Sequence, residues 1–130
     1  IYCLVFCQFN MRKRILFLTG KMGGYNAMKP FLKLIKKSKN FDLNIAVTDQ
    51  HLMRKFGYTY DKIRKDFEKK DIIKILSNQT RDDSSNRSVA ISKILNEISK
   101  IFSRKKIDLV LLYGDRLESL VTAISCLNYS

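Results

Sequence analysis

Residue types that build metal centres and disulfide frameworks are scarce in this chain. It has three cysteines and one histidine in 130 residues. The cysteines, at Cys3, Cys7 and Cys126, are odd in number and lack the paired spacing of a zinc site. We therefore expect no metal ion and no cofactor, and the reduced thiols of a cytoplasmic protein. We interpret Cys126, on an apolar helix face with Val121 and Ile124, as a small core residue rather than a nucleophile.

Long hydrophobic runs are missing as well. The first ten residues are apolar and aromatic, but a membrane span needs about 20 such residues. Their basic neighbours follow them, in Met11-Arg12-Lys13-Arg14, whereas a secretory signal peptide carries its positive charges first. We therefore expect no membrane association. Met11 is the more natural start, so we interpret residues 1–10 as a non-native or upstream extension rather than as an extra strand.

Acidic residues are in the minority, with 12 carboxylates against 25 lysines and arginines and a formal net charge of +13. Such a balance raises nucleic acid as a partner. The lysines, however, line the polar sides of two expected helices around residues 29–39 and 62–70, and no zinc-finger spacing, RNP-type aromatic motif or basic zipper accompanies them. Solvated helix faces are the favoured interpretation, with no specific nucleic-acid partner. A non-catalytic basic binding or interaction domain is the alternative function.

Apolar runs and amphipathic stretches alternate along the chain. Strands are expected at 15–18, 41–48, 72–76 and 107–113, and helices at 28–35, 61–68 and 88–102, with a mobile polar loop at 77–86. Gly20, Gly23 and Gly24 are expected to form a turn, and Pro30 to fall in the early turns of the first helix. This alternation predicts an α/β fold, a Rossmann-like parallel sheet with helices on both faces, formed by residues 11–130.

Polar residues stand directly after three of the expected strands. Thr19-Gly20 follows the first strand, Thr48-Asp49-Gln50-His51 the second, and Gly114-Asp115-Arg116 the last. Parallel strands end at one edge of their sheet, and open α/β sheets bind ligands at that edge. The sequence therefore predicts one crevice that receives polar groups from all three strand ends.

Each of these groups also has a plain structural interpretation. The turn at Gly20 lacks G-x-G-x-x-G spacing, so it is either a phosphate-approaching turn or a simple strand-to-helix connection. His51 is either an acid or base near neutral pH or an inert loop residue. Asp115 and Arg116 are either a functional pair or a helix cap with a salt bridge, and Glu118 is a second carboxylate near the crevice or an ordinary first-turn acid.

Several of these segments together resemble a known enzyme family. They are Lys13-Arg14-Ile15-Leu16-Phe17-Leu18-Thr19-Gly20, Lys29-Pro30, Val47-Thr48 with His51-Leu52, Phe56-Gly57-Tyr58-Thr59-Tyr60, and Gly114-Asp115-Arg116 with Glu118. In this order they are similar to the amino-terminal part of the UDP-N-acetylglucosamine 2-epimerase family, in particular its hydrolysing branch, which makes N-acetylmannosamine for sialic-acid-type sugars. The resemblance runs from Met11 to the end of the chain.

The resemblance implies one half of a glycosyltransferase-B-like (GT-B-like) fold, with a UDP-sugar substrate in the cleft between two Rossmann-like halves. It implies elimination of UDP after proton removal at C2 of the sugar, then addition of water. On this basis the catalytic residues would be Asp115, His51 and Glu118. Substrate-binding residues would be Gly20, Lys21, Tyr25 and Arg116. A homo-oligomer is compatible with the resemblance.

The chain also departs from the family pattern. The first turn of the family usually reads Thr-Gly-Thr-Arg-Ala-Asp-Tyr, and here Met22 and Gly24 stand at the arginine and aspartate positions. Lys21 could partly replace the missing cation, although lysine lacks the bidentate fork of arginine. The carboxyl-terminal half of the family fold lies beyond this sequence. We therefore expect a truncated amino-terminal domain that is inactive alone.

Overall fold

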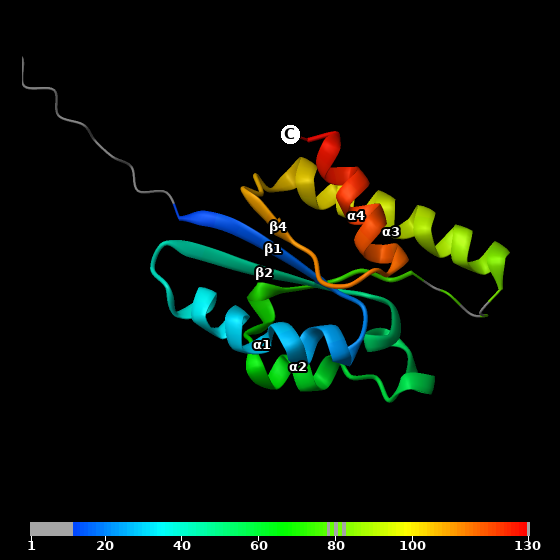
Figure 1. Ribbon diagram of the computed structural model, residues 1–130, viewed down its shortest axis with the longest axis horizontal. Helices are drawn as coiled ribbons and strands as arrows, with labels where there is room; N and C mark the ends of the chain where they lie inside the picture. Colours follow the sequence, from blue (N-terminus) through cyan, green and yellow to red (C-terminus); the bar gives the residue numbers. More distant parts are fainter. Residues whose placement is uncertain (1–11, 78, 80, 82, 130) are drawn as a thin grey trace, which may run out of the picture.

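The structure, a computed structural model of the chain, describes residues 12–77, 79, 81 and 83–129. The extension predicted at residues 1–10 lies outside these residues, as do Cys3 and Cys7. The strands are β1 (Lys13–Thr19), β2 (Phe41–Val47), β3 (Ile72–Lys74) and β4 (Leu109–Leu111). They form a four-stranded parallel sheet in the order β3-β2-β1-β4. All four strands therefore end at the same edge (Figure 1).

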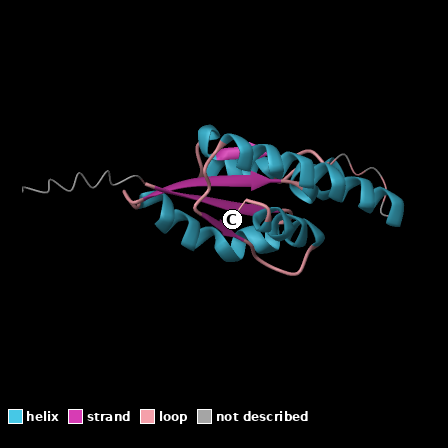
Figure 2. Cartoon of the chain, turned by 90° about the horizontal axis from the view of Figure 1, so that it is seen from above, coloured by secondary structure: helices cyan, strands magenta, loops and turns pink. Residues whose placement is uncertain are grey.

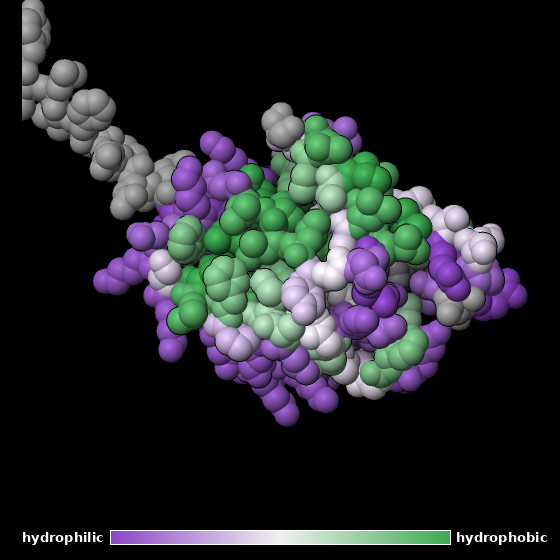
Figure 3. Space-filling model, in the orientation of Figure 1, coloured by the Kyte–Doolittle hydropathy of each residue, from purple (hydrophilic) through white to green (hydrophobic). Residues whose placement is uncertain are grey.

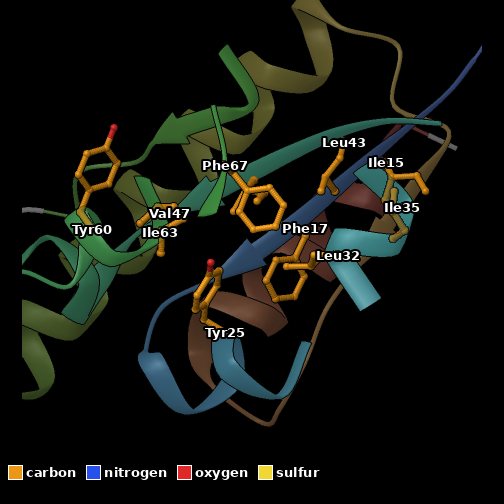
Figure 4. Close-up of a cluster of buried hydrophobic side chains, with 11 residues drawn as sticks. Ile15, Phe17, Tyr25, Leu32, Ile35, Leu43, Val47, Tyr60, Ile63 and Phe67 are labelled. Atoms are coloured by element: carbon orange, nitrogen blue, oxygen red, sulfur yellow. The ribbon is translucent and has the colours of Figure 1, made fainter. Parts of the chain in front are cut away.

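Side chains of β1 and β2 alternate between two hydrophobic clusters, one on each face of the sheet. Phe17 and Ile45 belong to the first cluster, which packs against helical residues such as Leu32 and Ile63 (Figure 4). Leu16 belongs to the second, on the opposite face. This alternation follows from the two-residue period of a strand, and it buries both faces of the central strands.

Helices cover both faces of this sheet (Figures 1 and 2). α1 (Met22–Lys37) and α2 (Tyr60–Asp66) pack on the first cluster, and α3 (Ser84–Arg104) and α4 (Leu117–Leu127) on the second. Three short 3-10 turns, η1 (Asp49–Leu52), η2 (Arg54–Phe56) and η3 (Lys69–Asp71), lie between β2 and β3. The predicted α/β fold, a Rossmann-like parallel sheet with helices on both faces, is confirmed.

The first helix begins earlier than its apolar stripe predicts. Gly23 and Gly24 are already helical, and Pro30 lies in the middle of α1 rather than in its early turns. Proline cannot donate to the carbonyl of Asn26 one turn before it, but both residues are exposed, so water can reach that carbonyl. Phe31, expected on the buried stripe, is 48% exposed.

The predicted polar loop at 77–86 ends too late, because α3 begins at Ser84. Asp83 caps this helix, since its carboxylate accepts a hydrogen bond of 2.9 Å from the Asn86 backbone N–H. Such residues favour helix starts although they add nothing to an apolar stripe. Sequence periodicity therefore missed the first turn.

The last strand, expected at 107–113, is shorter and less buried than its apolar run predicts. β4 is a short edge strand, and Leu109 is half exposed. Ile124 of α4, expected in the core beside Cys126, is also 46% exposed. Figure 3 shows hydrophobic side chains gathered over β4 and α4, a surface that includes Leu109, Leu120, Ile124 and Leu127.

None of the helices in the described part of the chain combines the length and hydrophobicity that crossing a bilayer requires.

Candidate functional site

The connections after β1, β2 and β4 meet at the carboxyl edge of the sheet, as predicted. Backbone hydrogen bonds keep the first two together, because Thr48 N–H donates to the Thr19 carbonyl oxygen at 3.0 Å. The Thr48 hydroxyl then donates to the Ile75 carbonyl oxygen at 2.8 Å, beyond the end of β3. These bonds place the turn after β2 in the middle of the edge.

Arg116 joins two carboxylates across this edge. Its Nη2 donates to Asp49 Oδ2 and its Nε to Glu118 Oε1. The two carboxylates are buried, at 9% exposure for Asp49 and 5% for Glu118, whereas Arg116 is only partly buried. The partners of Arg116 are therefore Asp49 and Glu118, and not its sequence neighbour Asp115. Asp49 was not among the predicted site residues, although its place at a strand end was a usable signal.

The cluster of Asp49, Arg116 and Glu118 carries one positive and two negative formal charges. Burial raises the pKa of Asp49, and the charge of Glu118 raises it further, while Arg116 acts in the opposite direction. Burial alone would lower the pKa of Arg116, but its hydrogen bonds and charge interactions with both carboxylates outweigh that effect and raise it. The guanidinium stays charged, and Asp49 is the carboxylate that accepts a proton more readily than usual.

Gly20 makes room for this cluster. A Cβ atom at position 20 would lie 2.9 Å from Glu118 Cδ and closer still to Oε1. Gly20 itself is buried, and α1 begins two residues later with no side-chain cap from Lys21. A side chain at position 20 would therefore force the Glu118 carboxylate to move.

Two cavities open beside the cluster, of about 400 Å³ and about 190 Å³. Asp115, Arg116 and Glu118 line both of them. The larger cavity is also lined by Asp49, Gln50, Met53, Lys55, Phe56, Ser77, Gln79, Arg87, Ala90, Ile91, Ile94 and Leu117. The smaller is also lined by Phe17, Leu18, Thr19, Gly20, Lys21, Gly24, Tyr113, Gly114 and Ser119.

Asp115 is exposed at the border of these cavities. It follows Gly114, whose φ of +94° suits glycine, and it precedes α4, whose N-cap is Arg116. Asp115 does not cap the helix, so the helix-cap interpretation does not account for it. Its carboxylate is accessible to a ligand in either cavity.

His51 lies beneath the site rather than in it. It is completely buried and lines neither cavity. Its Nε2 is 2.9 Å from Thr19 Oγ1, and its Nδ1 is 2.7 Å from Thr59 Oγ1. Burial lowers the pKa of His51 to about 4, so the ring is neutral near pH 7. An acid–base role would require one of these hydrogen bonds to break.

Tyr25 lines neither cavity, although its ring centroid lies 6.3 Å from that of His51. Its ring is buried in the first hydrophobic cluster, and its hydroxyl donates to Asp66 Oδ2 of α2 at 2.8 Å. Burial and the neighbouring Asp66 carboxylate raise the pKa of Tyr25. Of the predicted site residues, the structure thus brings together Gly20, Arg116 and Glu118 and lines the cavities with Lys21 and Asp115, but it sets Tyr25 and His51 apart.

Within the described residues, no three His, Cys, Asp or Glu side chains are grouped so that they could hold a metal ion. Cys126 is partly buried, and burial raises the pKa of its thiol.

A parallel sheet with helices on both faces, and with its polar groups at the carboxyl edge, belongs to the Rossmann-like class from which GT-B-like folds are built. The sequence profile described as UDP-N-acetylglucosamine 2-epimerase matches residues 33–129. The chain therefore belongs to the UDP-N-acetylglucosamine 2-epimerase family.

Three relatives show how much of the family the chain represents. It is 34% identical over 120 residues to the UDP-N,N'-diacetylbacillosamine 2-epimerase (hydrolyzing) of Legionella pneumophila, which covers 91% of this chain and 31% of that protein. It is 30% identical to the UDP-N-acetylglucosamine 2-epimerase of Neisseria meningitidis, covering 85% and 28%. It is 29% identical to the polysialic acid biosynthesis protein P7 of Escherichia coli, covering 87% and 29%. The chain thus spans less than a third of the length of these relatives.

Solved structures agree on the fold. A crystal structure of a UDP-N-acetylglucosamine 2-epimerase superposes with a TM-score of 0.71 at 19% identity, covering 91% of this chain and 31% of that one. The Neisseria meningitidis enzyme bound to UDP-GlcNAc superposes with a TM-score of 0.65 at 19% identity, covering 88% and 29%. The predicted resemblance to one half of a GT-B-like fold is confirmed.

Proposed function

We propose that this chain supplies the amino-terminal part of the catalytic cleft of a hydrolysing UDP-N-acetylglucosamine 2-epimerase, which converts UDP-N-acetylglucosamine and water to N-acetylmannosamine and UDP. Family membership and the relative named as hydrolysing support the reaction. The carrying observation is Asp115, an exposed carboxylate on the border of two cavities at the edge where three strands end.

The reaction needs groups of the kind found at this edge. A base removes the proton from C2 of the sugar, and the bond between C1 and the UDP oxygen breaks to leave a glycal. Water then adds its hydroxyl at C1 and a proton at C2 from the other face. In this proposal Asp115 exchanges a proton with the reacting sugar, and Arg116 stabilises the charge that develops on the departing phosphate. Glu118 supports Arg116 through their hydrogen bond.

Lys21 lines the smaller cavity and adds a second cation for the phosphates. It stands next to Met22, which occupies the position of the arginine in the usual first turn. Met22 packs against the hydrophobic core, so it offers no charge to a ligand. In this proposal His51 supports the site from below through Thr19, whereas Tyr25 joins α1 to α2 through Asp66.

The test is a chimaera in which this chain is joined to the remaining length of the Neisseria meningitidis relative. Asp115→Asn should lower kcat by about a hundredfold or more and change KM much less, because the carboxylate acts chiefly in the transition state. Asp61→Asn, which removes an exposed carboxylate of α2, is the matched control and should leave both constants unchanged. If Asp115→Asn is as active as the control, the chemistry does not depend on this edge.

One observation favours a second function. At the opposite edge of the sheet lies a cavity of about 510 Å³ lined by six cations and two carboxylates. They are Arg12, Arg14, Lys36, Lys70, Arg104 and Lys105, with Asp42 and Asp71. This cluster suits a basic binding domain for polyanions, and salt-dependent binding to duplex DNA distinguishes such a domain from solvated helix faces.

A further inference from the structure

We propose that Asp49 is an internal counter-ion of Arg116, and that a phosphate group of the ligand binds Arg116 only when Asp49 gives up its negative charge by taking up a proton. The inference rests on the proposed function, since it assumes that a UDP-sugar phosphate reaches the carboxyl edge. It adds a residue and a form of regulation that the proposed reaction does not require.

Arg116 can bind Asp49 or a ligand phosphate. Its side chain is 29% exposed and lines both cavities. A guanidinium has five N–H donors, and the bonds to Asp49 and Glu118 occupy two of them. The remaining donors are enough to bind phosphate oxygens. The obstacle to an anion is therefore charge and not a shortage of donors.

The charges around Arg116 oppose an anionic ligand. Asp49 and Glu118 together outweigh the guanidinium by one negative charge, and the exposed Asp115 stands beside them. Lys21 lines the smaller cavity, and Lys55 and Arg87 line the larger one. These cations line the walls of the cavities, whereas the two carboxylates are bonded to the guanidinium itself. Neutralising one carboxylate removes the excess negative charge where the phosphate would bind.

Asp49 is the carboxylate to which we assign the proton. Glu118 lies against Gly20 and lines both cavities, so its place is set by close packing. Asp49 stands on a short 3-10 turn and faces the larger cavity. Burial and the charge of Glu118 both raise the pKa of Asp49, which favours its protonated form. His51, two residues away, has a pKa of about 4 and stays neutral above about pH 5.

The backbone at this position allows a clean substitution. Asp49 has a φ of +51°, in the left-handed region that asparagine and glycine also adopt readily. Asp49→Asn keeps the shape of the side chain and removes its charge. Asp49→Gly removes the side chain altogether and suits the same backbone. Both variants remove the charge of Asp49, but only Asp49→Asn keeps a side chain of the same shape.

The experiment titrates the 130-residue chain with UDP-N-acetylglucosamine between about pH 5 and about pH 8. The ligand is suitable because both of its phosphates are diesterified and keep one charge each over this range. Binding is followed by the NMR signal of Arg116 Nε–H and by calorimetry in buffers with different ionisation enthalpies. Calorimetry in such buffers counts the protons taken up on binding.

For the unchanged protein we expect binding to tighten as the pH falls through the pKa of Asp49, by up to about tenfold per pH unit, with uptake of a proton. Near pH 8, Asp49→Asn and Asp49→Gly should bind at least about tenfold more tightly than the unchanged protein, and they should show no proton uptake. Asp61→Asn removes the same charge from the exposed start of α2, and should behave like the unchanged protein.

The outcomes separate this inference from the proposed function. Binding that is equally strong in the unchanged protein and both Asp49 variants, without proton uptake, overturns the counter-ion role and leaves the proposed function standing. Loss of binding in the Asp49 variants, with their folded NMR spectra retained, also overturns it, because Asp49 would then hold Arg116 in place for the ligand. If no variant binds at any pH, the counter-ion role is overturned, and the proposed function is then decided by the chimaera alone.

Discussion

The carboxylate of Glu118 lies directly against the Cα of Gly20, so two residues nearly a hundred positions apart in the chain depend on each other. Glu118 keeps its bond to Arg116 only while position 20 has no side chain. Asp49, which is bonded to the same guanidinium, depends on this arrangement too. The site is therefore a set of close contacts in which one added methyl group, at position 20, would displace the Glu118 carboxylate.

Gly20→Ala should therefore lower the free energy of unfolding by about 1–3 kcal/mol, because the new Cβ overlaps a buried carboxylate that must move. Gly23→Ala is the matched control. A Cβ there approaches nothing nearer than Lys21 Cε at 4.0 Å, and alanine is the better helix former, so this variant should gain up to about 1 kcal/mol. Urea unfolding of both variants measures the difference. Equal effects would mean that Glu118 does not occupy the space over Gly20.

At the element scale, α1 and α2 are joined through one carboxylate. Asp66, in the last turn of α2, accepts bonds from Tyr25, Lys29 and Lys33 of α1. Burial alone would raise the pKa of Asp66, but these three bonds outweigh it and lower the pKa to about 2. The polar contacts therefore join the two helices on one face of the sheet.

Tyr25→Phe tests this assignment. Asp66 keeps both lysines after the change, so the free energy of unfolding should fall by only about 0.5–1.5 kcal/mol, the usual net value of one hydrogen bond. UDP-N-acetylglucosamine binding, measured by NMR titration, should be unchanged. The control is Tyr129→Phe, whose hydroxyl bonds Ser103 at 3.1 Å on the surface and whose loss should cost less than about 0.5 kcal/mol. Weaker ligand binding in Tyr25→Phe, but not in Tyr129→Phe, would support the prediction that Tyr25 contacts the substrate.

At the scale of the whole molecule, the surface divides by charge. The net charge of +13 is carried largely by the helices and by the cation-lined cavity at the amino edge of the sheet. The surface over β4 and α4 is instead hydrophobic, and α4 contains one charged residue, the buried Glu118 (Figure 3). Association with polyanions is therefore expected away from the candidate site.

Binding to duplex DNA should be weak, independent of sequence and lost steeply with added salt, because solvated lysines act only by releasing counterions. Fluorescence anisotropy with two unrelated duplexes over a salt gradient measures both properties. The double variant Arg14→Gln, Arg104→Gln in the amino-edge cavity should weaken binding no more than Lys62→Gln, Lys65→Gln on the exposed side of α2. Tight, salt-resistant binding to one duplex, abolished only by the cavity variant, would favour the basic binding domain over the epimerase proposal.

Local pattern was enough to determine the class of fold. Continuous apolar runs such as 15–18 indicate strands buried on both faces, and the apolar stripe of residues 91–102 indicates a helix, because these periods depend only on neighbouring residues. Ends of elements were less predictable. Asp83 begins α3 by a hydrogen bond to the backbone, which leaves no mark in the hydrophobic period. The burial of β4 depends on which strands flank it, and in the described residues it pairs only with β1.

Polar groups at one edge of a parallel sheet are predictable from local pattern, because every strand of such a sheet ends at the same side. Which of these groups meet depends on how the chain packs. Asp49 pairs with Arg116 from 67 positions away, and His51 is buried against Thr19, leaving Asp115 open to the cavities. These ion pairs and hydrogen bonds depend on how distant segments pack and on how much water each group loses. Neither can be predicted from neighbouring residues in the sequence.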